Sequence, residues 1–338
     1  MANNHKRILL RVAESALNGA EIHLCTKVVA IQDQPGPEQN PRVLVHTDGR
    51  SFDFDEVVLT VPLGCLKRND IAFNPPVPSA IEQAINATSY SRLEKVYISF
   101  PAAFWDTASH QLSPLTNIPS DGSFVESREW ASGDHKNSVP RFPGFAHFLC
   151  PTYSAQNPEC WTLEVQSLSS SIHFGEYARP TLLFSIYGPC ATHITSLITS
   201  LSPSSPQYFT AINDFFRPYY ALLPNYVPEH PDCHPRMVLA TDWHHDELAG
   251  CGSYMNFQVR KDIENGQDAV MLEDDIRALR EGMPERGIWL AGEHTAPFVA
   301  LGTTTGAYWS GESVGMRILG AYGLAKPGMT DSGVDSTI

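Results

Sequence analysis

Residues 288–312 read IWLAGEHTAPFVALGTTTGAYWSGE, and this stretch decides the fold. A short apolar run ends in Ala-Gly-Glu, a loop follows, and a Gly/Thr cluster opens a segment whose pattern favours a helix. Open α/β sheets bind their ligands at the carboxyl ends of their strands, where such a loop lies. The stretch therefore predicts an α/β chain with a ligand held at the end of this strand.

Glu293 stands where the predicted strand ends, and its carboxylate can accept hydrogen bonds from the hydroxyls of a sugar-like ligand. Gly302 and Gly306 allow close backbone approach, and the first N–H groups of a helix have no intrahelical partner. Such amides favour a carbonyl or a partly anionic ring. A flavin, with its polyhydroxyl chain and electron-rich ring edge, fits the pattern. The same residues also fit a structural role, in which Glu293 caps a helix and the glycines turn the chain.

The composition is that of an acidic globular protein. The chain has 338 residues, 42% of them hydrophobic, and a formal net charge of −14, which argues against the clustered basic side chains that nucleic acid requires. It contains no run of 18 apolar residues and no secretory signal pattern. We expect no nucleic-acid or membrane partner, a cytoplasmic location and a flexible tail over residues 323–338.

The cysteines and histidines give no metal motif. Seven scattered cysteines without a C-x-x-C pair indicate thiols in a reducing compartment. His244 and His245 are adjacent, and adjacent side chains on a strand or helix point apart, so they are poor candidates for metal ligands. We expect no metal.

Helical and β patterns alternate along the rest of the chain. Asp48-Gly49 predicts a hairpin whose second strand continues to Pro62, and Pro218 is the expected end of a helix. Residues 106–160 show no clear period and are expected to form long loops. The other expected elements are helices near 6–18, 74–87, 191–201, 267–283 and 303–323 and strands near 21–32, 93–100, 181–188, 237–246 and 287–293.

Four stretches in a fixed order resemble the FAD-dependent amine oxidases, the family of monoamine oxidases, polyamine oxidases and lysine-specific histone demethylases. AGEHT…GTTTGAYWSGE resembles the family's C-terminal flavin-binding motif. The other three are KVVAIQ (27–32), DFDEVVLTVPLGCLKR (53–68) and SRLEKVYISFPAAFW (91–105). Within the family, the stretch 287–312 is most similar to fungal polyamine-oxidase-type sequences, and nothing resembles the helical insertion of the histone demethylases.

The resemblance implies a role for each matching residue. Lys95 would hold a water against the flavin N5, and Trp243 would pack near the flavin ring; both are candidate catalytic residues, and a surface lysine and a core tryptophan are the structural alternatives. Thr303, in place of an aromatic cage residue, and Tyr254 would face the substrate. The implied FAD-binding residues are Val28, Thr60, Pro62, Trp243, Glu293, Thr304, Thr305, Gly306 and Ala307. Because no cysteine follows Cys251, the resemblance implies noncovalent FAD.

One departure from the family is large. The G-x-G-x-x-G turn that binds the FAD pyrophosphate does not occur in this sequence, whose nearest string is Gly250-Cys-Gly252-Ser-Tyr-Met255. The chain therefore resembles the C-terminal portion of a two-domain amine oxidase fold. We expect an incomplete Rossmann-like FAD-binding domain over 1–62 and 237–322 and a mixed-sheet substrate domain with helices over 63–236.

The function implied by the resemblance is oxidation of the C–N bond of a polyamine or related amine to an imine, with O2 as acceptor and H2O2 as product. Two alternatives remain open. The chain is a truncated homologue that cannot hold FAD, or it is another flavin oxidase or desaturase of the same superfamily.

Overall fold

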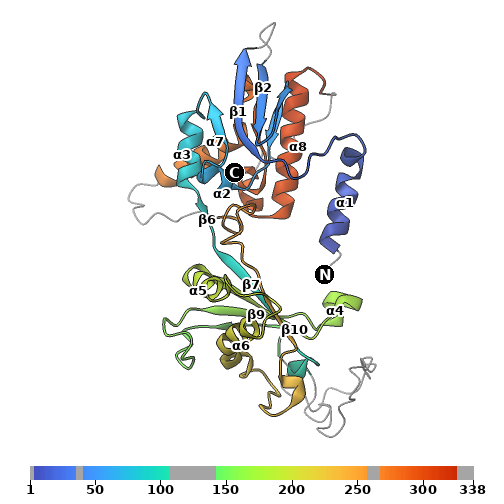
Figure 1. The fold of residues 1–338 in the computed structure, drawn as a ribbon, viewed down its shortest axis with the longest axis vertical. Coiled ribbons are helices and arrows are strands. Elements are labelled where there is room, and N and C mark those ends of the chain that lie inside the picture. The colour runs from blue at the N-terminus through green and yellow to red at the C-terminus, as the bar shows by residue number, and fades with distance from the viewer. Residues whose placement is uncertain (1–3, 36–40, 107–141, 257–266, 326–338) are drawn as a thin grey trace. The chain divides into compact units, whose positions relative to one another are not determined.

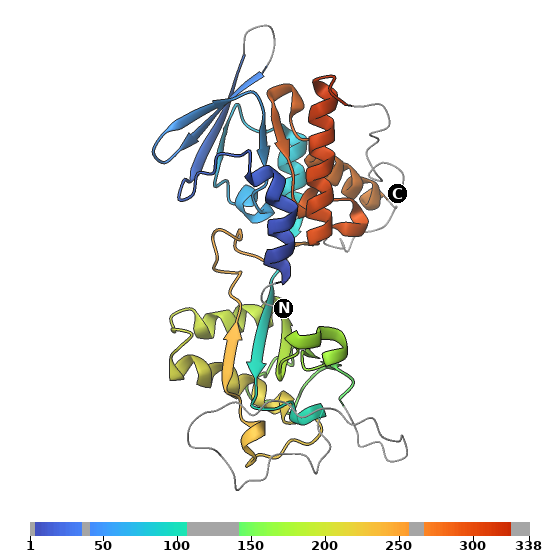
Figure 2. The same cartoon turned by 90° about the vertical axis from the view of Figure 1, so that its right-hand side faces the viewer.

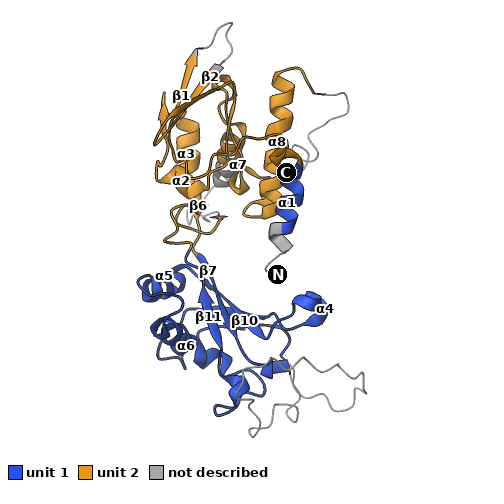
Figure 3. Ribbon diagram, turned by 45° about the vertical axis from the view of Figure 1, so that its right-hand side comes forward, with its two compact units in different colours: residues 1–14, 93–242 blue, residues 15–92, 243–338 orange. Residues whose placement is uncertain are grey.

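The computed structural model describes residues 4–35, 41–106, 142–256 and 267–325. The chain forms two compact units (Figure 3): residues 1–14 with 93–242 make unit 1, and residues 15–92 with 243–338 make unit 2. These boundaries differ from the predicted ones at 62/63 and 236/237. Residues 63–92 lie in unit 2 because Leu63, Leu66 and Ile81 are part of its hydrophobic core.

Helices and strands are mixed along the chain, which confirms the α/β class. The helices are α1 (Asn4–Leu17), α2 (Leu63–Lys67), α3 (Ser79–Ala87), α4 (Ser171–Phe174), α5 (Gly188–Ile198), α6 (Pro206–Tyr220), α7 (Gln267–Glu281) and α8 (Thr304–Ala321). The strands are β1 (Val28–Pro35), β2 (Pro41–Thr47), β3 (Ser51–Phe54), β4 (Val57–Leu59), β5 (Ala72–Asn74), β6 (Ser89–Tyr90), β7 (Leu93–Ser99), β8 (Phe145–Phe148), β9 (Leu163–Ser167), β10 (Thr181–Tyr187), β11 (Met237–Ala240), β12 (Met255–Asn256) and β13 (Ile288–Leu290).

Unit 2 contains a four-stranded sheet of order β3-β2-β1-β5, in which only the β1–β5 pair is parallel. Figure 2 shows its blue strands and the red α8 within this unit. Strands β4 and β13 form a separate parallel pair, and β6 pairs with β12. Helix α8 packs Val314 and Ile318 against Trp289 of β13. The parallel β4–β13 pair therefore lies directly beside the helix that the Gly/Thr cluster opens.

The predicted hairpin is confirmed, but its second strand is not continuous. Strands β2 and β3 pair across the Asp48-Gly49 turn, with the Thr47 N–H donating to the Arg50 carbonyl over 2.8 Å. The prediction that this strand runs on to Pro62 is wrong. Residues 57–59 instead pair with β13, because that pairing buries Leu59 in the core of unit 2.

Unit 1 is built on one antiparallel sheet of order β11-β7-β10-β9-β8, labelled in part in Figure 1. Strand β7 alternates, so that Val96 and Ile98 are fully buried while Lys95 is exposed. The buried side chains pack against α5 and α6 in one aromatic-rich core. Lys95 consequently lies on the sheet face opposite these two helices.

Several local predictions are corrected. Helix α6 continues past Pro218 to Tyr220, since Tyr219 and Tyr220 are fully buried and hold the last turn in the core. Residues 21–27 form no strand, and β11 ends at Ala240 instead of continuing to residue 246. Of the loops predicted over 106–160, residues 107–141 lie outside the described part, as does the predicted tail beyond residue 325; residues 145–148 form β8.

Candidate functional site

The carboxyl ends of β4 and β13 meet at one edge of unit 2. Leu59 pairs with Leu290 in parallel register, and the Ala291 N–H donates to the Leu59 carbonyl over 2.9 Å. Thr60 follows the first strand and Glu293 follows the second, so both predicted residues lie just beyond the same edge. This edge is where parallel strands present ligand-binding groups.

Glu293 joins two loops at this edge. Its Oε1 and Oε2 accept the Met255 N–H over 3.1 and 3.3 Å. Burial raises the pKa of the Glu293 carboxyl, and backbone hydrogen bonds from Met255 and Gly302 oppose that rise. A carboxylate has about four acceptor positions, so Glu293 can still accept from ligand hydroxyls. The structural role and the ligand role are therefore compatible.

The N-terminus of α8 contributes donors. Thr303 is the N-cap: its Oγ1 accepts the Gly306 N–H over 2.9 Å, and its carbonyl accepts the Ala307 N–H over 3.0 Å. The first-turn N–H groups of Thr304 and Thr305 have no intrahelical acceptor, and both residues are exposed. Of the four residues predicted to meet the flavin ring through their backbone, these two present N–H groups that a ligand can reach.

The two residues predicted to face the substrate lie close together. A Cβ added at Gly302 would lie 2.9 Å from Cδ2 of Tyr254, so the tyrosine ring lies directly against the residue that precedes Thr303. Gly302 also has φ +68°, a backbone conformation that favours glycine. The Tyr254 carbonyl accepts the Ser91 N–H over 2.8 Å, which fixes this loop.

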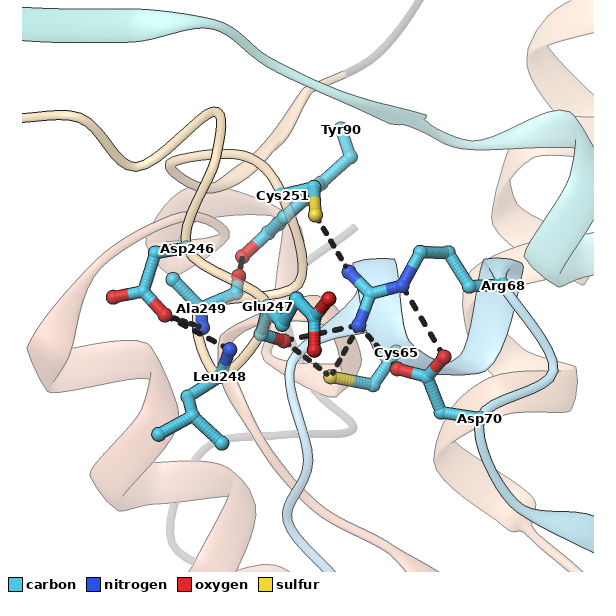
Figure 4. Close-up of polar contacts among 9 residues, drawn as sticks. All are labelled: Cys65, Arg68, Asp70, Tyr90, Asp246, Glu247, Leu248, Ala249 and Cys251. Carbon is cyan, nitrogen blue, oxygen red and sulfur yellow. Dashed lines mark hydrogen bonds and ion pairs between the residues drawn. The ribbon is translucent and has the colours of Figure 1, made fainter. Parts of the chain in front are cut away.

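The loop between Trp243 and Tyr254 is anchored on α2 (Figure 4). The Arg68 guanidinium donates to the Glu247 carbonyl over 3.0 Å and to Asp70 and Cys251, and the Tyr90 hydroxyl donates to the Ala249 carbonyl over 2.7 Å. Trp243 is 42% exposed, which excludes the plain core tryptophan of the structural alternative. Pro62 caps the other end of α2, its carbonyl accepting the Cys65 N–H.

His294 was not identified from the sequence as a residue of interest. His294 is 1% exposed, and neither ring nitrogen has a hydrogen-bond partner in the described part of the chain. Burial lowers the pKa of His294 to about 4, so the ring is neutral at pH 7. Its position directly after Glu293 was visible in the sequence, but its burial depends on contacts that the sequence pattern does not contain.

Lys95 lies in unit 1, within a polar row across the sheet. The register aligns Lys95 with Ser185, Ser185 with Glu164, and Glu164 with His147, so these side chains share one face. Glu164 accepts from His147 Nε2 over 2.9 Å and from the Tyr187 hydroxyl over 2.7 Å. Because neighbouring strands are about 4.8 Å apart, Glu164 lies about 10 Å from Lys95 across two strands.

Val28, predicted to bind FAD, begins β1 in the four-stranded sheet, separate from the β4–β13 pair. The described residues hold no group of three His, Cys, Asp or Glu side chains that could bind a metal ion. No helix in the described part of the chain has the length and apolar content that crossing a membrane requires.

The chain is similar in sequence to known flavin-containing amine oxidoreductases. Residues 6–147 match the family model of the flavin containing amine oxidoreductases. The chain is 31% identical to lysine-specific histone demethylase 2 of Homo sapiens over 112 residues, which are 33% of this chain and 13% of that protein. It is 33% identical to polyamine oxidase 3 of Oryza sativa subsp. japonica over 94 residues, 28% of this chain and 19% of that protein.

The fold is similar to that of putrescine oxidase. A wild-type putrescine oxidase structure bound to putrescine aligns with a TM-score of 0.57 at 16% identity, covering 91% of this chain and 51% of that chain. The chain thus spans about half of a solved relative, and at most 19% of the two curated relatives above.

Proposed function

This chain is a relative of the flavin-containing amine oxidoreductases, and from that premise we propose that it forms the flavin-ring and substrate-facing part of an amine oxidase. The reaction is oxidation of an amine C–N bond to an imine, with noncovalent FAD and with O2 reduced to H2O2. The polyamines are the preferred substrate class, as the sequence resemblance implies.

The observation that carries this proposal is the donor and acceptor set at the β4–β13 edge. Glu293 offers acceptor positions beside the exposed first-turn N–H groups of Thr304 and Thr305. These complement the hydroxyls of a ribityl or ribose chain and the electron-rich edge of a flavin ring. Bound flavin would supply the electron chemistry, and this edge of the protein would orient it.

The polar row of unit 1 supports an amine as the substrate. Lys95 is exposed on the open face of the sheet, consistent with the water-holding role that the resemblance implies. Glu164, on the same face, is 26% exposed and provides a carboxylate that attracts a protonated amine. The chain's own residues would therefore position the amine and a water, while the reacting amine nitrogen is neutral.

The missing pyrophosphate turn limits what the 338 residues do alone. The first turn of α8 offers donors for the ring, but the G-x-G-x-x-G turn that would cradle the pyrophosphate is absent from the sequence. We expect the chain to bind FAD weakly. A homologue that holds no FAD is the competing proposal.

A methylated lysine side chain is a second candidate substrate. Several relatives are histone demethylases, including lysine-specific histone demethylase 1 homolog 3 of Arabidopsis thaliana, which is 38% identical over 102 residues, 28% of this chain and 6% of that protein. Such a substrate has the same C–N chemistry as a secondary or tertiary amine. A polyamine carries a second cationic group that Glu164 would attract, and a methylated lysine side chain does not.

The test is peroxide release from the chain incubated with excess FAD and oxygen. Spermidine and a dimethyl-lysine peptide are compared at equal concentration, with free FAD as the blank. Peroxide with spermidine that exceeds the blank and the peptide supports the polyamine proposal. Release from the peptide alone favours the second candidate, and release from neither, with FAD shown to be bound, contradicts both.

A further inference from the structure

Two cysteines 186 positions apart in sequence contact the same arginine. Arg68 Nη1 lies 3.0 Å from Cys251 Sγ, and Arg68 Nη2 lies 3.9 Å from Cys65 Sγ. Figure 4 shows the guanidinium between the two sulfur atoms. Both thiols are free and partly exposed, so a small reagent can reach them.

The backbone holds the two thiols together. A Cβ added at Gly64 would lie 1.9 Å from the Gly250 carbonyl oxygen, so the residues directly before the two cysteines touch through their backbones. The Cys251 N–H donates to the Asp246 carbonyl over 2.9 Å, which closes the loop on itself. The pair is therefore a fixed feature of the fold and not a chance approach of two flexible side chains.

The two thiols differ in environment. The Asp70 carboxylate accepts hydrogen bonds from Nε and Nη2 of Arg68, whereas Nη1 donates to Cys251 Sγ. The guanidinium thus holds the Cys251 sulfur through a direct hydrogen bond, at less than the distance that separates it from the Cys65 sulfur. Burial raises the pKa of the Cys65 thiol, against the opposing effect of Arg68, and this thiol lies 3.7 Å from the Glu247 carbonyl that accepts from it. Because Cys65 is held as a thiol that donates to a carbonyl, we assign the first reaction to Cys251, whose sulfur contacts the guanidinium, and the second to Cys65.

We propose that Cys251 and Cys65 form a peroxide-sensitive thiol pair. The Cys251 thiolate attacks a hydroperoxide: an S–O bond forms, the O–O bond breaks, and hydroxide leaves and is protonated to water. Cys65 then attacks the sulfenic acid, an S–S bond forms, and a second water leaves with the Cys65 proton. Two thiols are oxidised by two electrons, and one H2O2 is reduced to two waters.

The second step requires Arg68 to move from between the sulfur atoms. Asp70 offers the guanidinium a carboxylate on the side away from Cys251, so it keeps an ion partner when it moves. The new bond would tie α2 to the loop that continues to Met255, whose N–H bonds to Glu293. Oxidation would thereby act on a loop of the proposed flavin site, although the thiol chemistry itself depends on no flavin.

The test is treatment of the full chain with H2O2, followed by alkylation of the remaining thiols and peptide mass spectrometry without reduction. The expected product is a Cys65–Cys251 disulfide. In Cys65→Ser, dimedone should trap a sulfenic acid at Cys251; in Cys251→Ser, Cys65 should stay reduced. Cys150→Ser, which alters an exposed thiol outside the pair, should leave the disulfide yield unchanged.

The role of Arg68 is tested in the same assay. Arg68→Lys keeps the charge and should keep the rate within about threefold, whereas Arg68→Gln removes the cationic donor at the Cys251 sulfur and should slow oxidation of Cys251 about tenfold. Circular dichroism of each variant confirms that it is folded. The proposal is wrong if Cys251 in the folded wild-type chain reacts no faster than Cys150, or if peroxide gives no link between Cys65 and Cys251.

Discussion

The carboxylate of Glu293 accepts the backbone N–H of Met255, a residue 38 positions earlier in the chain, with oxygen–nitrogen distances of 3.1 and 3.3 Å. This contact ties the loop after β13 to strand β12. It also leaves the carboxylate at the edge where β4 and β13 end. One side chain thereby holds the candidate site together and offers acceptors to a ligand.

Two substitutions at Glu293 test its structural role. In Glu293→Ala the Met255 N–H loses its acceptor, and we expect the free energy of unfolding to fall by about 1–3 kcal/mol. Glu293→Gln keeps an oxygen acceptor of the same length and should lose less than half as much. Urea unfolding measures both. Glu285→Ala, at an exposed glutamate, is the control and should change stability by less than about 0.5 kcal/mol. Equal losses in the alanine and glutamine variants would exclude this hydrogen bond as the cause.

His294 predicts a pH dependence of stability. The unfolded chain protonates this histidine below about pH 6.5, whereas burial keeps the folded one neutral until its pKa of about 4 is reached. Lowering the pH through this window therefore favours unfolding, by about 3 kcal/mol in total. His294→Leu cannot titrate and loses no hydrogen bond, so the difference in unfolding free energy between wild type and variant should change across pH 6.5 to 4.

The control for this titration is His173→Leu, at an exposed histidine of α4. The loss of stability at acid pH should persist in this variant, because His294 is still present. If the same loss also persists in His294→Leu, the buried histidine is not the origin of the acid sensitivity.

Two glycines of α8 make a matched pair. A Cβ at Gly306 would lie 2.0 Å from the Ala300 carbonyl oxygen, whereas a Cβ at Gly311 would meet nothing within 4 Å. Gly306→Ala should destabilise the chain by about 1–3 kcal/mol through overpacking. Gly311→Ala should stabilise it by about 0.5–1 kcal/mol, because alanine favours a helix. Thermal unfolding followed by circular dichroism measures both changes in stability. Effects of the same sign would contradict the close contact between Gly306 and the Ala300 carbonyl.

Lys95 is the residue whose loss should affect catalysis without affecting stability. Its side chain is exposed on the open face of the unit 1 sheet, so Lys95→Met should unfold within about 0.5 kcal/mol of wild type. If Lys95 holds a reacting water, peroxide release should fall about 10- to 100-fold. Lys27→Met, at another exposed lysine, should retain the wild-type rate. Equal rates in both variants would show that Lys95 takes no part in the reaction.

The sequence predicted the parts of the fold that short-range patterns encode. The apolar run at 288–290 and the helix from Thr304 are local signals, and both are confirmed. The hairpin at Asp48-Gly49 is confirmed for the same reason. The break between β3 and β4 was not predictable, because residues 57–59 join a different strand only through long-range pairing with β13.

The site was predictable where motif residues adjoin the strand ends and not where tertiary contacts decide. Glu293 follows the end of β13, as the pattern indicated, whereas Thr60 follows the end of β4, which the sequence pattern had placed at Pro62. The burial of His294 and the contact between Cys65, Arg68 and Cys251 depend on segments that are distant in sequence. The row of Lys95, Ser185, Glu164 and His147 depends on strand register, which single-strand patterns do not specify.

The central claim is that the edge formed by Thr60, Glu293 and the start of α8 holds a flavin. The most direct measurement is a titration of the purified chain with FAD, followed through the visible flavin absorbance and the flavin fluorescence. We predict a saturable spectral change that is weakened about tenfold in Glu293→Gln, because a neutral acceptor replaces a charged one. A wild-type chain that is folded yet leaves the FAD spectrum unchanged, or a folded Glu293→Gln chain that binds FAD as tightly as wild type, would contradict this account.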